Sequence, residues 1–400
     1  MINEFSLIEV LVRRSLGVGW IEPHFKANRI LHFPAENSMP ELENYPLEHL
    51  FEGNIYLFHA FDVGDDINLE KVKASGLVVP QPLSLSKFFK NYHLPLAIEM
   101  PDIQQSPTCV SAKIHNFGVI SLLYKIPFKD TLKNIRQQLE GIDNQWAEQS
   151  LIDVELIFKN IRPYIAKPHF FHTRSSYLVI QVDPQEKLLD MVKLKDSYGG
   201  IIASALRFET ETLSENHKNE ILASAIGYFR GDLIVVDTEA AFIYDDEYQD
   251  ILDFFEFANI QHLELRYFDR TLEQQLNYIY EGRVRKVPLA SYFPFIGTLS
   301  KGPVDDLDKL KVDISVIAER LEGSIKLAGE PYYSELYSLL TEKRELKNLK
   351  DAIDKKLEII KDVLSTLQHK TEAIREDMLT VSIIALIFIE LVIGILSYLK

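Results

Sequence analysis

The stretch EYQDILDFFEFANIQHLELRYFDRTLEQQLNYIYEG, residues 247–282, divides the chain into two regions of different character. Its apolar residues recur at helical spacing and form one face of an amphipathic helix. The acidic residues at its start suit the positive end of a helix dipole, and Gly282 is a typical stop. Residues 246–282 therefore predict one long amphipathic helix packed on the body.

Residues 1–245, before this helix, alternate between apolar runs and polar turns. Helical spacing is confined to residues 130–158 and to a small-residue segment after Gly199 and Gly200. The apolar runs that predict strands and hairpins are IYLFHAFDVGDDI (55–67), VSAKIHN (110–116), FGVISLLYKI (117–126), SYLVIQVD (176–183) and AIGYFRGDLIVVDTEAAFIYDD (225–246). The first region is therefore predicted to be an α+β body with antiparallel hairpins separated by helices.

Behind the long helix, residues 283–303 are rich in proline and glycine and predict a linker. Residues 304–378 then predict a helical hairpin, with Gly329 ending the first arm and Pro331 in the first turn of the second. We expect the second arm to pack on the first and to continue without a break as a helix of about 65–70 residues. Its coiled-coil-like stripe repeats every seven residues at Leu346, Ile353, Ile360, Leu367 and Ile374.

The segment SIIALIFIELVIGIL, residues 382–396, is apolar enough for a lipid bilayer. A helix over residues 379–399 covers the roughly 30 Å of hydrocarbon. Because the chain ends at Lys400, we expect a tail anchor with the body on the side of synthesis. The alternative is a buried helix of a soluble protein or an oligomer seam.

Glu390 lies near the middle of this predicted transmembrane helix. An acid there costs about 2.5–3.5 kcal/mol on insertion scales, so the helix can still insert. The helical neighbours of Glu390 offer no side-chain partner. We expect protonated Glu390 to form a hydrogen bond across a helix–helix contact, either to a second copy or to another membrane protein, with Gly394 allowing close approach. The alternative is an acid that faces lipid.

Composition excludes several classes of function. The formal charge of −16 disfavours binding to nucleic acid, whose phosphates reward clustered basic residues. A single cysteine, Cys109, excludes an intrachain disulfide framework and any cysteine-rich metal site, and it fits a reducing compartment. The first twenty residues have the form of neither a secretory signal nor a transit peptide. We therefore expect a cytoplasmic body.

No motif commits the chain to catalysis, and no cofactor or metal is predicted. Phosphate loops, a GxSxG elbow and the HExxH spacing are absent from the sequence. His169 and His172 are interpreted as structural or surface histidines, as is His262 beside Glu264. The acids between Asp245 and Glu256 are interpreted as a solvated helix start, because they lack the spacing of a calcium loop.

Four segments together resemble the required-for-meiotic-nuclear-division family. They are FHAFDVGDDINL (58–69), GYFRGDLIVVDTEAAFIYDD (227–246), FFEFANIQHLELRYFDRTLEQQLNYIY (254–280) and IIALIFIELVIGIL (383–396). With the two-helix stalk, the likeness spans roughly residues 55–399. It implies a membrane-anchored scaffold. Members in mitochondria are tied to organelle translation at the inner membrane, whereas this chain lacks a transit peptide and therefore resembles a bacterial relative.

Family motif residues carry over to Asn259, Glu264, Arg266 and Asp269 in the long helix, and to Ile389 and Glu390 in the final span. Arg266 and Asp269 are three residues apart and could pair on one helix face. Asn259 needs a hydrogen-bond partner on an otherwise apolar helix. The alternative interpretation of the long-helix residues is a polar network that fixes the packing between helix and sheet.

The sequence therefore predicts a tail-anchored scaffold, tether or assembly factor without catalytic activity that self-associates through its stalk and membrane helix. We expect it in the bacterial inner membrane with the body in the cytoplasm, and alternatively in the mitochondrial inner membrane. The alternative function is a membrane-anchored hydrolase or small-ligand sensor, with a pocket between sheet and long helix that uses Arg266, Asp269 and nearby acids.

Overall fold

Every residue described below lies within residues 45–400. The structure is a computed structural model. It describes residues 48–83, 87–89, 94–101, 107–170, 174–185, 190–280, 309–312, 314–319, 325, 327 and 329–398. The predicted linker over residues 283–303 lies outside these residues, as does most of the predicted first arm of the stalk.

Within the described residues, eight strands form one sheet in the order β3-β4-β5-β1-β7-β10-β9-β8. Neighbouring strands are antiparallel except β7 and β10, which are parallel. A second, two-stranded sheet pairs β2 (Asp66–Ile67) with β6 (Ile165–Ala166). The strands of the large sheet are β1 (Leu50–Asp62), β3 (Leu96–Ile98), β4 (Cys109–Ile114), β5 (Val119–Thr131), β7 (Ser175–Val182), β8 (Ala225–Ile226), β9 (Leu233–Val236) and β10 (Ala240–Tyr244).

Helices cover both faces of this sheet, because side chains along its central strands alternate between two buried clusters. In β7, for example, Leu178 and Ile180 face one cluster and Tyr177 and Val179 face the other. One face carries α3 and α4, and the other carries α6 and α8. The helices are α2 (Leu69–Ala74), α3 (Leu132–Ile161), α4 (Met191–Leu206), α5 (Glu215–Leu222), α6 (Gln249–Tyr280), α8 (Pro331–Lys343) and α9 (Leu346–Tyr398), with a short 3-10 turn η2 (Arg162–Tyr164).

The predicted α+β architecture with antiparallel hairpins is confirmed. The segments 110–116 and 117–126 lie in the β4–β5 hairpin, and SYLVIQVD coincides with β7 within one residue. One helix start was wrong, because α4 begins at Met191 and contains Gly199 and Gly200 in its interior. Its true start is marked by Asp190, whose carboxylate accepts hydrogen bonds from the Val192 and Lys193 amides.

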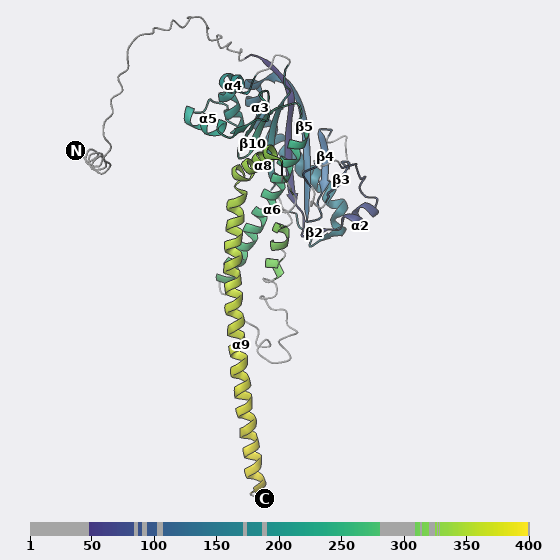
Figure 1. Cartoon of the computed structure of the whole chain (residues 1–400). Coiled ribbons are helices and arrows are strands. Elements are labelled where there is room, and N and C mark those ends of the chain that lie inside the picture. Colours follow the sequence, from purple (N-terminus) through teal and green to yellow (C-terminus); the bar gives the residue numbers. More distant parts are fainter. Residues whose placement is uncertain are drawn as a thin grey trace, which may run out of the picture. The chain divides into compact units, whose positions relative to one another are not determined.

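The predicted second arm of the stalk is divided into two helices. Pro331 begins α8 as expected, but the helix ends at Lys343 and α9 begins at Leu346. Glu345, between them, has a φ of 54°, a left-handed conformation that a continuing helix excludes. Beyond this break, α9 runs for 53 residues without interruption, as Figure 1 shows in yellow. The helix therefore continues into the apolar segment as expected, but it is shorter than the predicted length of about 65–70 residues.

The heptad stripe of α9 packs on α6, a partner that was not predicted, and on described residues of the predicted first arm. Leu346, Ile353 and Ile360 are buried in one cluster with residues from the second half of α6. The α6 residues in this cluster are Leu265, Phe268, Leu272 and Leu276, and Ile314 joins it from the first arm. Ile374 is half-buried, and the side chain of Leu367 lies outside the described residues. The stripe thus joins the stalk to the helix that covers the sheet.

The last part of α9 forms one candidate membrane span over residues 372–398, by its length and apolar composition. Its large side chains lie exposed; Leu386 is 65% exposed and Phe388 is 67% exposed. The hydroxyls of Thr380 and Ser382 donate hydrogen bonds to the carbonyl oxygens four residues earlier in the same helix. The helix itself therefore satisfies these hydroxyls, as a hydrocarbon environment requires.

Candidate functional site

A pocket of about 230 Å³ lies where the start of β7, the middle of α6 and the first turn of α9 meet. The described residues that line it are Arg174, Ser175, Leu263, Arg266, Asp269, Arg270 and Leu349. Two of them, Arg266 and Asp269, belong to the predicted family motif. The pocket lies between the sheet and the long helix, where the alternative function placed one.

Three guanidinium groups and one carboxylate line this pocket. The carboxylate of Asp269 already has a cation, because Lys356 of α9 places its Nζ 2.8 Å from Asp269 Oδ1. Asp269 is thus paired across to α9 and not with Arg266, its predicted partner. Within the described residues, Arg266 has no hydrogen-bond or ion-pair partner, and the buried Nε of Arg174 has no hydrogen-bond partner. Arg174 and Arg266 therefore bring to the pocket donors that no acceptor of the described residues uses.

A buried guanidinium, that of Arg344, lies behind the Ser175 wall of the pocket. Its Nη2 lies 2.8 Å from Ser175 Oγ, 3.0 Å from Asn259 Oδ1 and 2.8 Å from His262 Nδ1. Its Nη1 donates to the carbonyl oxygen of Thr238 at 3.1 Å. Arg344 therefore joins the bend between α8 and α9 to β7, to α6 and to the turn between β9 and β10.

The ring of Tyr177 in β7 supports the same guanidinium from one side. The Arg344 carbon Cζ lies 5.2 Å from the centroid of the ring, which favours a cation over its face. The Tyr177 hydroxyl donates to the carbonyl oxygens of Asp237 and Ala240, so the ring is fixed to the β9–β10 turn. Arg344 is 5% exposed, and its contacts hold it in one position.

Asn259 also belongs to this cluster, and the hydrogen-bond partner expected for it is Ser175. Its Nδ2 donates to the Ser175 carbonyl oxygen at 2.9 Å, and its Oδ1 accepts from Ser175 Oγ at 2.7 Å. Because a guanidinium only donates hydrogen bonds, His262 Nδ1 accepts from Arg344. Burial, followed by the charges of Arg344 and Arg266, lowers the pKa of His262 to about 3.

This arrangement speaks against hydrolysis by Ser175. A nucleophilic serine needs a base that accepts its proton, and the only histidine nitrogen beside it in the described structure is His262 Nδ1. That nitrogen already accepts from Arg344, and the low pKa of His262 makes it a weak base. Burial lowers the pKa of Arg344 to about 10, so the guanidinium stays charged at neutral pH. The cluster therefore positions helices and leaves no activated nucleophile.

Glu264, another family-motif residue, lies apart from this cluster. It is 2% exposed, and its Oε1 has no hydrogen-bond partner in the described residues. Burial and then the nearby carboxylates of Asp62 and Asp65 raise the pKa of Glu264 well above its usual value. Asp62 is paired with His169, whose Nε2 lies 3.0 Å from Asp62 Oδ2, and this bond raises the pKa of His169.

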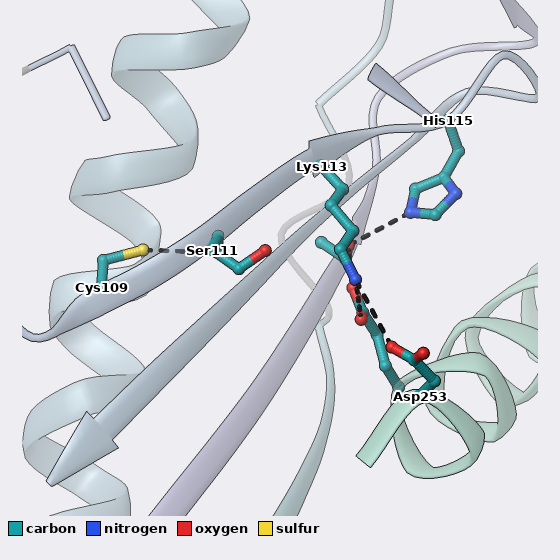
Figure 2. Close-up of polar contacts among 7 residues, drawn as sticks. Cys109, Ser111, Lys113, His115 and Asp253 are labelled. Atoms are coloured by element: carbon teal, nitrogen blue, oxygen red, sulfur yellow. Dashed lines mark hydrogen bonds and ion pairs between the residues drawn. The ribbon is translucent and has the colours of Figure 1, made fainter. Parts of the chain in front are cut away.

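A second buried polar network connects the β4–β5 hairpin to the first half of α6, and Figure 2 shows its core. Lys113 Nζ lies 2.6 Å from Glu256 Oε2, and Asp253 lies at 4.0 Å. Ser121 donates to Glu256 Oε1 at 2.7 Å, and His115 Nε2 lies 3.1 Å from Ser121 Oγ. Glu256 is therefore a buried member of an ion pair, which corrects the solvated helix start predicted for it.

The predicted site residues thus lie in separate places. Asn259 belongs to the Arg344 cluster, Glu264 lies near Asp62, and Arg266 and Asp269 line the pocket. Glu390 and Gly394 lie in the exposed part of α9, where a Cβ built on Gly394 would meet nothing within 4 Å. His172 lies outside the described residues, in which no group of three histidine, cysteine or acidic side chains that could hold a metal is found.

Sequence reasoning missed Arg174, Ser175 and Arg344. Arg174 and Ser175 precede a predicted strand without any motif around them. Arg344 lies in the charged run TEKRELK, which is typical of a solvated helix face. The one available signal was Asn259, because a polar side chain on an apolar helix face requires a partner from elsewhere.

Replacing Arg344 tests the structural role of this cluster. Because charged hydrogen bonds are lost and Asn259 and His262 lose a donor, Arg344→Met is expected to lower the free energy of unfolding by about 2–3 kcal/mol. Urea unfolding of the full chain in detergent measures this. The control is Arg162→Met, which removes an exposed arginine of η2 and should change stability by less than about 0.5 kcal/mol. Equal stability of the two variants would contradict the assigned role.

Acidification tests the burial of neutral His262. The unfolded chain binds a proton at this histidine below about pH 6.5, whereas the folded chain binds it only near pH 3, so stability falls as the pH falls between these values. At pH 5 the loss amounts to about 2 kcal/mol for this residue. His262→Gln should therefore lose about that much less stability than the parent between pH 7 and pH 5. The exposed His217→Gln control should follow the parent, and a His262→Gln profile that does so too would refute the assignment.

The chain is similar to a family model and to a known protein. Residues 52–250 match a family model described as "Uncharacterized protein MJ0711, N-terminal domain". The chain is 28% identical over 290 residues to "Uncharacterized protein MJ0711" of Methanocaldococcus jannaschii, covering 68% of this chain and 86% of that protein. No solved structure matches. The resemblance to the required-for-meiotic-nuclear-division family is not confirmed by these matches. The β-sheet body, over residues 52–250, thus matches the N-terminal domain of the MJ0711 family, and the likeness to the MJ0711 protein extends over most of this chain.

Proposed function

We propose that this protein is a membrane-anchored scaffold, tether or assembly factor without catalytic activity. The observation that carries the proposal is the continuity of α9 from Leu346, beside the Arg344 cluster, through residues 372–398. A continuous helix transmits position, because bending it requires breaking its backbone hydrogen bonds. The membrane end of the helix therefore has a fixed direction at the point where it leaves α6.

The packing of α9 supports a mechanical role of this kind. Its first half is held to α6 by the buried stripe that contains Ile353 and Ile360. Lys356 adds a polar contact, since its Nζ lies within 4 Å of carboxylate oxygens of Asp269 and Glu273 in α6. A stalk whose first half is fixed to the helix that covers the sheet is suited to hold the body at a defined orientation to a membrane.

The partner in the membrane is a second copy of the chain or another membrane protein. The Glu390 carboxyl has no hydrogen-bond or ion-pair partner within the described part of the chain. An acid in hydrocarbon gains most from a hydrogen bond across a helix contact, and Gly394, one turn further, permits a close approach. The proposed contact is a hydrogen bond between Glu390 and the facing helix.

The proposed location is the cytoplasmic membrane of a bacterial cell, with the body in the cytoplasm. One cysteine in 400 residues fits a reducing compartment. The mitochondrial inner membrane is the alternative, and it follows from the likeness of four segments to the required-for-meiotic-nuclear-division family. We also propose, from the residues of those four segments, that this chain is a distant relative of that family.

A small-ligand sensor is the second candidate function, and the arginine-lined pocket favours it. The pocket is bounded by β7, α6 and α9, the three elements that the Arg344 cluster also connects. A ligand there would contact both the body and the stalk. The hydrolase form of this alternative is disfavoured because His262 Nδ1, the histidine nitrogen beside Ser175 in the described residues, accepts a hydrogen bond from Arg344.

Self-association through Glu390 is tested by two matched variants in native membranes. Glu390→Gln keeps a hydrogen-bonding side chain and should preserve the yield of chemically cross-linked oligomer within about twofold. Glu390→Leu removes the hydrogen bond and should reduce that yield about threefold or more, because such bonds contribute about 0.6–2 kcal/mol in membranes. The yield is measured after cross-linking at equal expression, and equal oligomer yield in both variants would sink the proposal.

A further inference from the structure

We propose that the pocket between β7, α6 and α9 is a binding site for a small dianionic oxyanion, such as phosphate, a phosphate monoester or a dicarboxylate. The inference rests on the second candidate function above, the ligand sensor, and names the chemical class of its ligand. It is carried by two arginines that line the pocket, Arg174 and Arg266, because Arg174 Nε and the Arg266 side chain have no acceptor in the described structure.

The first step concerns hydrogen-bond donors. Buried donors are almost always paired, and an unpaired one requires an explanation. Arg174 Nε is buried and has no acceptor in the described residues, although its side chain lines the pocket. Arg266 lines the same pocket and has no hydrogen-bond or ion-pair partner among those residues. A ligand rich in acceptor oxygens would satisfy both side chains.

The second step concerns charge. Arg174 and Arg266 line the pocket without an ion-pair partner in the described residues, and Asp269, the one carboxylate of the described lining, is already paired with Lys356. The buried cation Arg344 lies behind Ser175, and Arg266 is close enough to lower the pKa of Arg344. The charge of Arg174 acts to lower the pKa of Asp143. Asp143 does not line the pocket, because it belongs to α3 on the opposite face of the sheet. Glu239 is the acid close enough to raise the pKa of Arg344. Arg174 and Arg266 thus leave two positive charges at the pocket without a described ion-pair partner, and these favour a dianion.

The third step concerns size and shape. The pocket volume of about 230 Å³ is below the roughly 300–1,000 Å³ that drug-sized ligands occupy, so the ligand is small. Leu263 and Leu349 contribute apolar surface to the lining. Guanidinium groups match the planar and tetrahedral oxygens of carboxylates and phosphates with paired hydrogen bonds. Size, donors and charge thus identify the same class of ligand.

The experiment is equilibrium dialysis of the full chain in detergent at about 0.15 M ionic strength. Inorganic phosphate, succinate and the dication putrescine serve as probes, so that phosphate and dicarboxylate ligands are distinguished. Saturable binding of phosphate or succinate at one site per chain is expected. Arg266→Met, an exposed position where folding is preserved, should raise the dissociation constant about tenfold or more, and Arg174→Met should do the same.

The control removes an equal charge elsewhere. Arg162→Met lies in η2, outside the pocket lining, and should leave the dissociation constant unchanged within about twofold. No saturable anion binding, or equal binding by the pocket variants and the control, would overturn the inference. Binding of putrescine in place of the anions, lost in Arg266→Met, would also overturn it while leaving the ligand-sensor function standing. The anchoring function is measured separately by oligomer yield in membranes and does not depend on these results.

Discussion

A single buried cation determines how the two halves of this protein are joined. The guanidinium of Arg344 contacts β7 through Ser175, α6 through Asn259 and His262, and the β9–β10 turn through Thr238. Burying a charge is costly unless the charge is hydrogen-bonded, so the Arg344 guanidinium is stable only where these partners surround it. Because Arg344 occupies the bend where α8 ends and α9 begins, its contacts connect the start of the stalk to the sheet and to α6.

The long helix α6 packs on two different surfaces along its length. Its first half packs on the sheet through residues such as Phe254 and Phe255, with the buried Lys113–Glu256 ion pair at the β4–β5 hairpin. Its second half leaves the sheet and packs on the stripe of α9. The arginine-lined pocket lies where these two surfaces meet. A ligand at this position would contact the body and the stalk together, which links the two candidate functions in one physical arrangement.

Local patterns were sufficient for much of the fold, since strand alternation and helical spacing are properties of consecutive residues. They predicted β7, the β4–β5 hairpin and α6 within a few residues. Long-range pairing was not accessible in this way. The stripe of α9 was recognised, but its packing on α6 was not predicted, because apolar residues do not specify which surface covers them. The break before α9 lies at Glu345, which has a left-handed conformation. Because this residue is not a glycine, nothing in the sequence signals a helix end there. Arg344 and Glu256 looked like surface charges, because burial of a charge depends on partners far away in sequence.

The most direct test of the account is amide hydrogen exchange along α9 in the full chain reconstituted into lipid vesicles. The account predicts two protected blocks, residues 346–364 packed on α6 and residues 379–398 within the bilayer. Protection should persist for hours in both, because one is buried in protein and the other has no access to water. Rapid exchange over residues 379–398 would contradict a membrane-spanning stalk, and rapid exchange over residues 346–364 would contradict its fixed attachment to the body.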